Sequence, residues 1–290
     1  MKIALIGADG QLGTDLYKYF KDKQDIDLTP LTQKEIEVCD INVCDDVLLK
    51  IKPDIIINTA AFHQVDLCED EVDTTFEVNV AGVKNLCEVA LKMDSALMHF
   101  STDFVFGGYQ KQTPFTEEDC PKPISTYGIS KLAGELTLQY MMEKYYLLRV
   151  CGLYGHAGSL GKGYNFVELM IELAEKGKDI KVVDDQVLTP TSTSDLASKI
   201  YELIQTGKYG LYHMTNTGKC SWYEFACEIF RIAGLSPNIE PVTSDEFGAK
   251  AKRPSYSVLD NRNLRDIGLA DMRNWKEALK DYIWARKDKK

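Results

Sequence analysis

The 290-residue sequence has no long hydrophobic run and no excess of basic residues. No apolar stretch approaches the roughly 18 residues that a membrane-spanning helix needs, so a membrane protein is not expected. Lysine and arginine number 34 against 44 aspartate and glutamate residues, which gives a net charge of −10. An acidic surface repels nucleic acid, which proteins bind through broad basic faces. A small anionic ligand remains compatible, because backbone N–H groups at one helix start can hold a phosphate.

Paired cysteines and clusters of metal ligands are also lacking. The eight cysteines form no C-x-x-C pair, and the four histidines do not stand at ligand spacing beside them. This pattern argues against structural zinc, and no metal site is expected. The N-terminal residues lack the layout of a signal peptide. The thiols are therefore expected to be reduced and the protein to be cytoplasmic.

The first 150 residues contain a regular alternation of short apolar runs and amphipathic stretches. The apolar runs predict strands at Lys2–Ile6, Asp54–Asn58, Ala96–Ser101 and Tyr146–Val150. Helical spacing begins after Gly13 and recurs at Thr74–Met93 and Lys131–Lys144. Strands that alternate with helices are typical of a parallel sheet, so the sequence predicts an α/β fold for this part of the chain.

After Val150 the alternation loosens and glycines become frequent. The elements expected there are helices at Asn165–Lys176, Ser194–Gln205 and Ser221–Ala233, and strands at Ile180–Val183 and Gly210–Thr215. Ser221 and Glu224 form a capping box at the start of the third helix. We expect residues 1–150 to be a dinucleotide-binding domain. Residues 151–290 are expected to form a smaller, mixed α/β substrate-binding region, with some elements packing back on the first sheet.

A glycine-rich turn, Gly7-Ala8-Asp9-Gly10-Gln11-Leu12-Gly13, lies between the first predicted strand and the first predicted helix. Glycines let the backbone turn sharply and approach a pyrophosphate, and the helix start offers free N–H groups and the positive end of its dipole. In this context the turn predicts a dinucleotide site on a Rossmann-like, doubly wound parallel sheet. The alternative is a glycine-rich turn without a ligand.

The residues that follow this turn leave the identity of the cofactor open. About twenty residues past the last glycine, where an NAD-specific protein has an acidic residue for the ribose, stand Thr32, Gln33 and Lys34. No arginine stands there to favour a 2′-phosphate, so NADH and NADPH are both candidates. Asp40 and Ile41 are candidate contacts for the adenine, and an acidic turn residue without a ligand is the alternative.

Tyr127 and Lys131 stand at positions i and i+4 near a predicted helix start, so their side chains share one face. A phenol with the ordinary pKa of about 10 is a poor proton donor at neutral pH, and a neighbouring ammonium lowers that pKa. Such a pair also occurs by chance in many helices. Thr102, however, follows a predicted strand at the carboxyl edge, where doubly wound sheets bind ligands. Together with the glycine turn, these residues predict proton transfer to a carbonyl oxygen.

These motifs resemble those of the dTDP-4-dehydrorhamnose reductase family, within the extended short-chain dehydrogenases/reductases. STDFVF followed by YGISK is fairly specific to that branch, whereas the glycine turn and Y-x-x-x-K mark only the superfamily. The similarity runs nearly end to end. The matching segments include GADGQLG (Gly7–Gly13), INTAAFHQVDLCE (Ile57–Glu69), VNVAGVKNL (Val78–Leu86), STDFVFGG (Ser101–Gly108), TYGISKLAGE (Thr126–Glu135), LLRVCGLYG (Leu147–Gly155), VVDDQVLTPT (Val182–Thr191) and RPSYSVLDN (Arg253–Asn261).

The resemblance implies hydride transfer from NADH or NADPH to the C4 ketone of a nucleotide-linked 4-keto-6-deoxyhexose. The expected reaction converts dTDP-4-dehydrorhamnose to dTDP-rhamnose, in the synthesis of precursors of cell-surface polysaccharide. In this reaction Tyr127 would donate the proton, Lys131 would bind the nicotinamide ribose, and Thr102 would polarise the carbonyl oxygen. Asp103 would help to place the sugar. Arg253, in a basic stretch, is our candidate for the diphosphate of the substrate.

The resemblance also assigns cofactor contacts by position. Gly10, Gln11 and Leu12 would meet the pyrophosphate, with Gly7 and Gly13 shaping the turn around it. The residues assigned to the adenine and the ribose side are Asp40, Ile41, Ala60, Ala61 and Phe62. Asn79 is expected to tether a loop rather than to act in catalysis. A homodimer is compatible with the sequence.

Some positions depart from the family pattern. Gly152 stands where a tryptophan commonly contacts the sugar, and Phe104 replaces a common tyrosine. Some bacterial members bind Mg²⁺ between subunits through acidic residues. Asp15 occupies the first such position, but Ser194 stands where a glutamate would be expected, so no metal is predicted.

Two other functions stay open. One is a non-catalytic, NAD(P)-binding regulatory subunit on the same fold. The complete set of Thr102, Tyr127 and Lys131 favours an enzyme, because a pure binding module has no use for a tuned phenol. The other is a nucleotide-sugar epimerase or dehydratase. Thr102-Asp103-Phe104 lacks the second carboxylate that dehydratases usually add, so reduction is favoured.

Overall fold

The computed structural model describes residues 1–157 and 163–287, so residues 158–162 of the glycine-rich segment lie outside the described residues. Its centre is a six-stranded parallel sheet with the strand order β10-β5-β4-β3-β1-β2. In chain order, its strands are β1 (Lys2–Ile6), β2 (Asp27–Leu31), β3 (Ile55–Asn58), β4 (Ala96–Thr102), β5 (Tyr145–Val150) and β10 (Gly210–His213). Strand order reverses between β1 and β3, and doubly wound sheets bind ligands at such a point.

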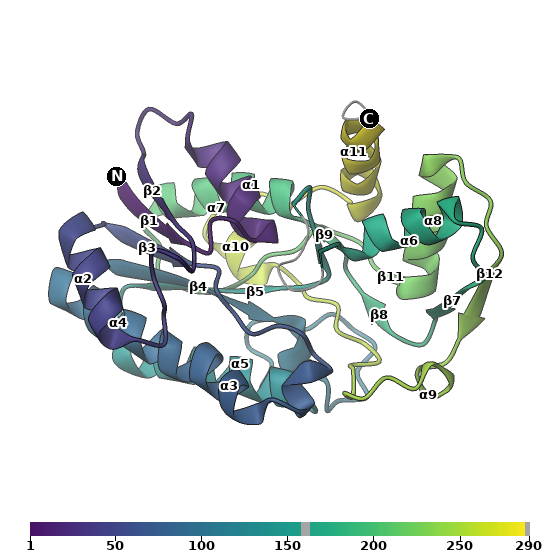
Figure 1. Ribbon diagram of the computed structural model, residues 1–290, viewed down its shortest axis with the longest axis horizontal. Helices are drawn as coiled ribbons and strands as arrows, with labels where there is room; N and C mark the ends of the chain where they lie inside the picture. Colours follow the sequence, from purple (N-terminus) through teal and green to yellow (C-terminus); the bar gives the residue numbers. More distant parts are fainter. Residues whose placement is uncertain (158–162, 288–290) are drawn as a thin grey trace.

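Helices cover both faces of this sheet (Figure 1). On one face lie α1 (Gln11–Phe20), α7 (Thr193–Thr206) and α10 (Arg262–Asp266). On the other face lie α2 (Ile41–Ile51), α3 (Val72–Phe76), α4 (Gly82–Met93) and α5 (Thr126–Met141). A π-helical segment, η2 (Glu77–Ala81), joins α3 to α4, and two short 3₁₀ turns are η1 (Leu67–Glu69) and η3 (Asp103–Phe106). The predicted doubly wound α/β class is confirmed.

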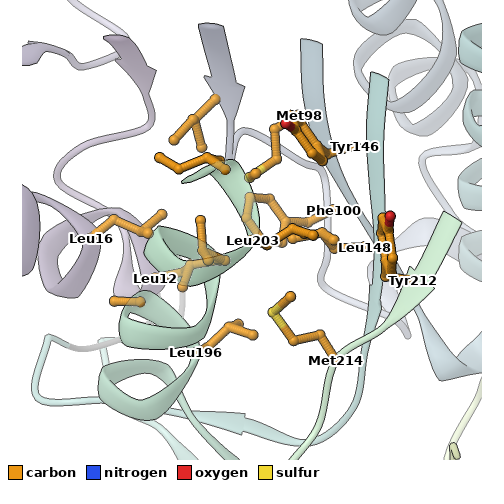
Figure 2. Packing of buried hydrophobic residues seen from close by; sticks show 14 of the residues in the cluster. Leu12, Leu16, Met98, Phe100, Tyr146, Leu148, Leu196, Leu203, Tyr212 and Met214 are labelled. Atoms are coloured by element: carbon orange, nitrogen blue, oxygen red, sulfur yellow. The ribbon is translucent and has the colours of Figure 1, made fainter. Parts of the chain in front are cut away.

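The strands of the sheet are buried on both faces, which explains why they are nearly continuous apolar runs. Leu148 of β5 packs with Leu16 of α1 and Leu203 of α7 in one hydrophobic cluster (Figure 2). The neighbouring residue Leu147 points to the opposite face and packs in a second cluster, which includes Leu86 of α4. This alternation follows from the two-residue period of a strand.

A smaller region lies beside the sheet, on the right of Figure 1. Its helices are α6 (Phe166–Glu175), α8 (Trp222–Ala233), α9 (Ser244–Phe247) and α11 (Trp275–Lys287). Its short strands pair as β6 (Leu153–Tyr154) with β9 (Thr191–Ser192), β7 (Ile180–Val183) with β12 (Ile239–Val242), and β8 (Val187–Leu188) with β11 (Cys220–Ser221). The predicted capping box of Ser221 and Glu224 begins α8.

The chain after Val150 does not stay in the smaller region. Helix α7 packs on α1, and β10 pairs in parallel with β5 at the edge of the main sheet. Helix α5 begins at Thr126, earlier than the predicted start at Lys131, because Ser125 caps it by accepting a hydrogen bond from the N–H of Gly128 at 3.2 Å. In the part of the chain that the structure describes, no helix is long and apolar enough to span a bilayer.

Candidate active site

The glycine-rich turn lies at the point where the strand order reverses, against the carboxyl end of β3. A Cβ atom on Gly7 would lie 2.4 Å from Thr59 Oγ1, and a Cβ on Gly13 would lie 2.0 Å from the carbonyl oxygen of Gly7. Gly7 also has a φ of +77°, a conformation that L-residues with side chains rarely adopt. Thr59 Oγ1 donates to the carbonyl oxygens of Ile6 at 2.8 Å and Gly7 at 3.1 Å. The turn therefore has no room for larger residues at these two positions.

Helix α1 starts within this turn, with Gly10 as its N-cap residue. Glycine has no side chain to cap the helix, and the first N–H groups of a helix have no intrahelical acceptor. Gln11 and Leu12 provide the first of these groups. The side chain of Gln11 is directed elsewhere, since its Nε2 donates to the carbonyl oxygen of Leu153 at 3.1 Å. An uncapped helix start in a tight backbone turn fits a pyrophosphate, as the sequence predicts.

Asp40, the first residue assigned to the adenine, is the N-cap of α2. Its Oδ1 accepts hydrogen bonds from the N–H of Asn42 at 2.9 Å and of Val43 at 3.4 Å. Ile41 is the first residue of the helix. The structure thus gives Asp40 a capping role, which is the alternative that its sequence position allowed. A contact of Asp40 or Ile41 with an adenine stays a prediction.

The loop after β3 carries Ala60, Ala61 and Phe62, the residues assigned to the ribose side of a cofactor. Asn79, in the π-helical segment, accepts a hydrogen bond from the N–H of Phe62 at 2.9 Å and donates to the Phe62 carbonyl at 3.0 Å. The same side chain donates to Ser130 Oγ of α5 at 3.0 Å. Asn79 therefore tethers this loop to the helix that carries Tyr127 and Lys131, in agreement with its expected role.

Thr102 and Tyr127 come together at the carboxyl edge of the sheet. Thr102 ends β4, Tyr127 lies in the first turn of α5, and the hydroxyl of Thr102 is close enough to lower the pKa of the Tyr127 phenol. The start of α5 packs closely on η3, since a Cβ on Gly128 would lie 2.6 Å from the carbonyl oxygen of Phe104. The ring of Phe104 meets that of Tyr127 edge-on, with 5.5 Å between centroids. Two of the three predicted catalytic residues are thus neighbours.

The pKa of the Tyr127 phenol is raised, so its ionisation is disfavoured. Burial raises its pKa above the ordinary value, and the negative charge of Asp103 acts in the same direction, whereas the hydroxyl of Thr102 opposes them. The sequence predicted that Lys131 would lower this pKa, and the structure shows the opposite direction because burial dominates. At neutral pH the phenol therefore keeps its proton, which is the form that an acid requires.

Lys131 is buried on the same helix, and its amine turns toward the sheet. Its Nζ lies 3.2 Å from Nε2 of His99, a buried residue of β4. Burial lowers the pKa of Lys131 to about 8, and the carboxylate of Glu135 partly opposes that change. The spacing of Tyr127 and Lys131 predicted a shared face but gave no indication of this second partner.

Asp103, assigned to the sugar, faces into the protein. Its Oδ2 accepts from Ser257 Oγ at 2.6 Å, and its Oδ1 accepts from Thr102 Oγ1 at 3.1 Å. Burial raises its pKa, while hydrogen bonds from Ser257, Cys151 and Thr102 oppose that rise. Asp103 thus connects the reacting edge to the C-terminal half of the chain and orients the hydroxyl of Thr102.

Arg253, our candidate for the diphosphate, is held in an ion pair. Its Nη1 and Nη2 donate to the two carboxylate oxygens of Asp66 at 3.1 and 2.8 Å. The neighbouring Lys250 pairs with Asp70. The stretch that contains both basic residues is thereby fastened to the segment that follows β3. Binding of a diphosphate by Arg253 would require it to exchange or share Asp66, so this role stays a prediction.

Gly152, which replaces the tryptophan of the family pattern, has no space for a side chain. Its φ is +55°, and a Cβ atom there would lie 2.8 Å from Leu188 Cδ1. Backbone atoms of Thr189 and Pro190 lie 3.3 Å from the same point. A tryptophan at this position would therefore need a different backbone conformation and a shift of Leu188.

Two residues that the sequence analysis did not single out also shape the site. Glu69 accepts hydrogen bonds from the N–H and Oγ1 of Thr126, at 2.9 and 2.7 Å, which fixes the start of α5 beside Tyr127. Ser257 binds Asp103 as described above. Both residues lie in segments that match the family pattern, and that match was the only signal for them. Within residues 1–157 and 163–287, no three His, Cys, Asp or Glu side chains gather as metal ligands.

A doubly wound sheet with this turn and with Thr102, Tyr127 and Lys131 at its carboxyl edge is typical of the short-chain dehydrogenases/reductases, a class of dinucleotide-dependent oxidoreductases. Within that class, the chain belongs to the family described as RmlD substrate binding domain, whose model matches residues 1–287. The resemblance inferred from the sequence motifs is therefore confirmed.

Individual relatives cover almost the whole chain. The spore coat polysaccharide biosynthesis protein SpsK of Bacillus subtilis is 38% identical over 98% of both chains. A crystal structure of a dTDP-4-dehydrorhamnose reductase from Clostridium acetobutylicum is 40% identical, with a TM-score of 0.94 and coverage of 99% of this chain and 100% of the other. The dTDP-4-dehydrorhamnose reductase of Bacillus anthracis, solved in complex with NADP, is 37% identical, with a TM-score of 0.93 and coverage of 98% and 99%.

Proposed function

We propose that the protein reduces the C4 ketone of dTDP-4-dehydrorhamnose to give dTDP-rhamnose, with NADH or NADPH as reductant, for the synthesis of cell-surface polysaccharide. The observation that carries this proposal is the placement of Thr102 beside Tyr127 at the carboxyl edge of the sheet, with Lys131 one helical turn further along α5. Relatives of nearly equal length that are named for this reaction support the choice of substrate.

The proposed roles follow from donor chemistry. A bound nicotinamide cofactor supplies the hydride that adds to the carbonyl carbon. Tyr127 donates its phenolic proton to the oxygen, and its raised pKa keeps that proton in place until the oxygen gains charge. Thr102 donates a hydrogen bond to the same oxygen after releasing Oδ1 of Asp103. Lys131 presents N–H donors to the ribose hydroxyls and holds the cofactor next to the ketone.

The cofactor and the substrate would meet different parts of the chain. We assign the cofactor to the first 150 residues together with α7 and β10, which complete the sheet and its helical cover. The smaller region and the Arg253 segment would surround the nucleotide sugar. Ser257 joins the two parts through Asp103.

Assembly and location form part of the same proposal. Helix α5 exposes Ile129, Leu136 and Tyr140, with 47%, 58% and 91% of their surfaces accessible, along one side of the helix. We infer that this face pairs with a second copy to form a homodimer, which sedimentation of the purified protein would test. All eight cysteines are free thiols, which supports a reducing compartment, the cytoplasm.

The decisive experiment is an absorbance assay of nicotinamide oxidation with dTDP-4-dehydrorhamnose, run in parallel with NADH and NADPH. Consumption of either cofactor with formation of dTDP-rhamnose would support the proposal. The Tyr127→Phe variant is the matched control, because it removes the proton donor and leaves the glycine turn intact. Tight cofactor binding by the native protein without turnover would instead favour a regulatory subunit.

A further inference from the structure

A chain of hydrogen bonds runs beneath the reacting edge, from the loop after β3 to Lys131. The backbone N–H of Ala60 donates to Asn58 Oδ1 at 3.0 Å. Asn58 Nδ2 lies 3.3 Å from His99 Nδ1, and His99 Nε2 lies 3.2 Å from Lys131 Nζ. The side chains of Asn58, His99 and Lys131 are all buried, with 3%, 1% and 2% of their surfaces exposed. Water therefore has little access to any donor or acceptor in this hydrogen-bonded chain that lacks a protein partner.

The direction of this chain is fixed at the Ala60 end. A backbone N–H only donates, so the oxygen of the Asn58 amide must face Ala60 and its NH₂ group must face His99. Nδ1 of His99 must then accept a hydrogen bond. A neutral imidazole with an accepting Nδ1 carries its proton on Nε2, and that proton points at Lys131.

A charged Lys131 would leave two donors facing each other, because an ammonium has three N–H groups and no lone pair. Turning over the amide of Asn58 does not help, since it places NH₂ against the N–H of Ala60. Adding a proton to His99 creates a second mismatch at Nδ1. Of the groups in this chain, the amine of Lys131 is the one that removes the conflict, by giving up a proton and accepting from His99.

We propose that His99, oriented by Asn58, is a positioning residue that presents its Nε2–H to Lys131 and disfavours the charged form of the Lys131 amine in the cofactor-free protein. A neutral amine still has two N–H donors, enough for the ribose hydroxyls that the proposed function assigns to it. The inference rests on that function only for the role of Lys131. The tautomer of His99 and its effect on the amine follow from the geometry alone.

The charged groups around Lys131 are consistent with this assignment. Glu135, one turn further along α5, favours the ammonium. Its carboxylate, however, already binds Arg149 of β5, with Nε to Oε1 at 2.9 Å and Nη2 to Oε2 at 2.6 Å. On the side of β4, burial lowers the pKa of His99 well below its ordinary value, so the imidazole is neutral. Burial likewise lowers the pKa of Lys131 to about 8.

The test is a nitrogen-15 NMR spectrum of histidine-labelled, cofactor-free protein, in which the two ring nitrogens show whether each carries a proton. The sequence has only four histidines, and the His99→Phe variant assigns the signals of His99. We expect a protonated Nε2 and an unprotonated Nδ1 at a pH slightly above 8. His213 is an internal control, because its Nδ1 faces the carbonyl oxygen of Phe115 at 3.0 Å and must carry the proton. A proton on Nδ1 of His99 would overturn the proposal.

The Asn58→Asp variant provides a second measurement. A carboxylate accepts both from Ala60 and from His99, so the proton of His99 should move to Nδ1 and the ring should then accept from Lys131. An unchanged tautomer in a folded variant would overturn the proposed chain. If the variant does not fold, the spectrum of the native protein decides. Both spectra are recorded without cofactor or substrate, so a failure of the reductase assay would not alter them.

Discussion

Two buried imidazoles in the same sheet, those of His213 and His99, differ in whether the hydrogen-bond donors and acceptors around them match. His213 of β10 lies between an arginine and a carbonyl group: its Nε2 is 3.4 Å from Arg149 Nη1, and its Nδ1 is 3.0 Å from the carbonyl oxygen of Phe115. Hydrogen bonds can run from the guanidinium through the ring to the carbonyl without conflict. His99 of β4 lies between a lysine and a chain that ends in the backbone N–H of Ala60. There, the groups at both ends of the hydrogen-bonded chain, the Lys131 amine and the N–H of Ala60, can be donors.

The difference suits Arg149 to a structural role and Lys131 to the chemical role that we propose. Arginine cannot lose its proton, so it suits the cluster in which every donor meets an acceptor. Arg149 completes that cluster by its two hydrogen bonds to Glu135. Lysine changes its charge readily when it is buried. Lys131 occupies the cluster in which a charged amine would face the N–H donor of His99. Lys131 lies one helical turn beyond Tyr127 on α5, whereas Arg149 lies against His213 of the edge strand β10.

Replacement of Lys131 should separate activity from stability most clearly. We expect Lys131→Met to lower kcat/KM for nicotinamide-dependent reduction by about 10²-fold or more, since it removes the amine that we propose binds the ribose. The urea midpoint should change little, because a long apolar side chain replaces a buried amine. Lys144→Met is the control, since Lys144 is an exposed partner of Asp94. An activity within tenfold of the native protein would contradict the role of Lys131.

A replacement in the cluster of Arg149, Glu135 and His213 should instead lower stability. Arg149→Met leaves the buried carboxylate of Glu135 without its partner, which typically costs about 3–5 kcal/mol of unfolding free energy. The measurement is urea denaturation, with the double variant Arg149→Met/Glu135→Gln expected to recover part of the loss. Arg262→Met breaks an exposed pair with Glu118 and should cost less than about 1 kcal/mol. A loss for Arg149→Met as small as that of this control would mean that the buried pair is not structural.

Much of the fold could be predicted from the sequence because its signals are local. The apolar run Lys2–Ile6, the strand at Ile180–Val183 and the capping box of Ser221 and Glu224 occur where they were expected. The strand Asp27–Leu31 was not predicted, because Pro30 and two polar residues conceal it. A proline is tolerated there since β2 is an edge strand, and the position of a strand in a sheet is not visible from its own sequence.

The candidate site could be predicted only in part for a related reason. Thr102, Tyr127 and the glycine turn each stand out by spacing or by their place at the end of an element. The partners of these residues come from distant segments: Ser257 lies 154 residues from Asp103, which it binds, and His99 lies 32 residues from Lys131. A histidine in an apolar strand looks like an ordinary core residue. Its role becomes visible only when the fold places it beneath α5.

The two clusters can be compared further through acid stability. Burial is the main cause that lowers the pKa of His213 to about 3, with the charge of Arg149 as the next. In the unfolded chain a histidine binds a proton below about pH 6.5, whereas the folded His213 stays neutral down to about pH 3. The unfolding free energy therefore decreases as the pH falls from about 6.5 toward 3. We expect the native protein to lose more unfolding free energy than His213→Gln between about pH 7 and pH 5. Parallel urea titrations measure this, and equal losses would contradict the shift.

Lys131 predicts a smaller change at alkaline pH. Its pKa is lowered from 10.5 to about 8 in the folded protein, chiefly by burial. Between these values the unfolded chain holds a proton that the folded protein has released, so the contribution of Lys131 to stability rises with pH. We expect the unfolding free energy of the native protein, relative to Lys131→Met, to be higher at about pH 9.5 than at about pH 7.5. Both proteins contain the same tyrosines and cysteines, whose ionisation cancels in the difference. A difference that stays constant or falls would show that Lys131 remains charged, as Arg149 does.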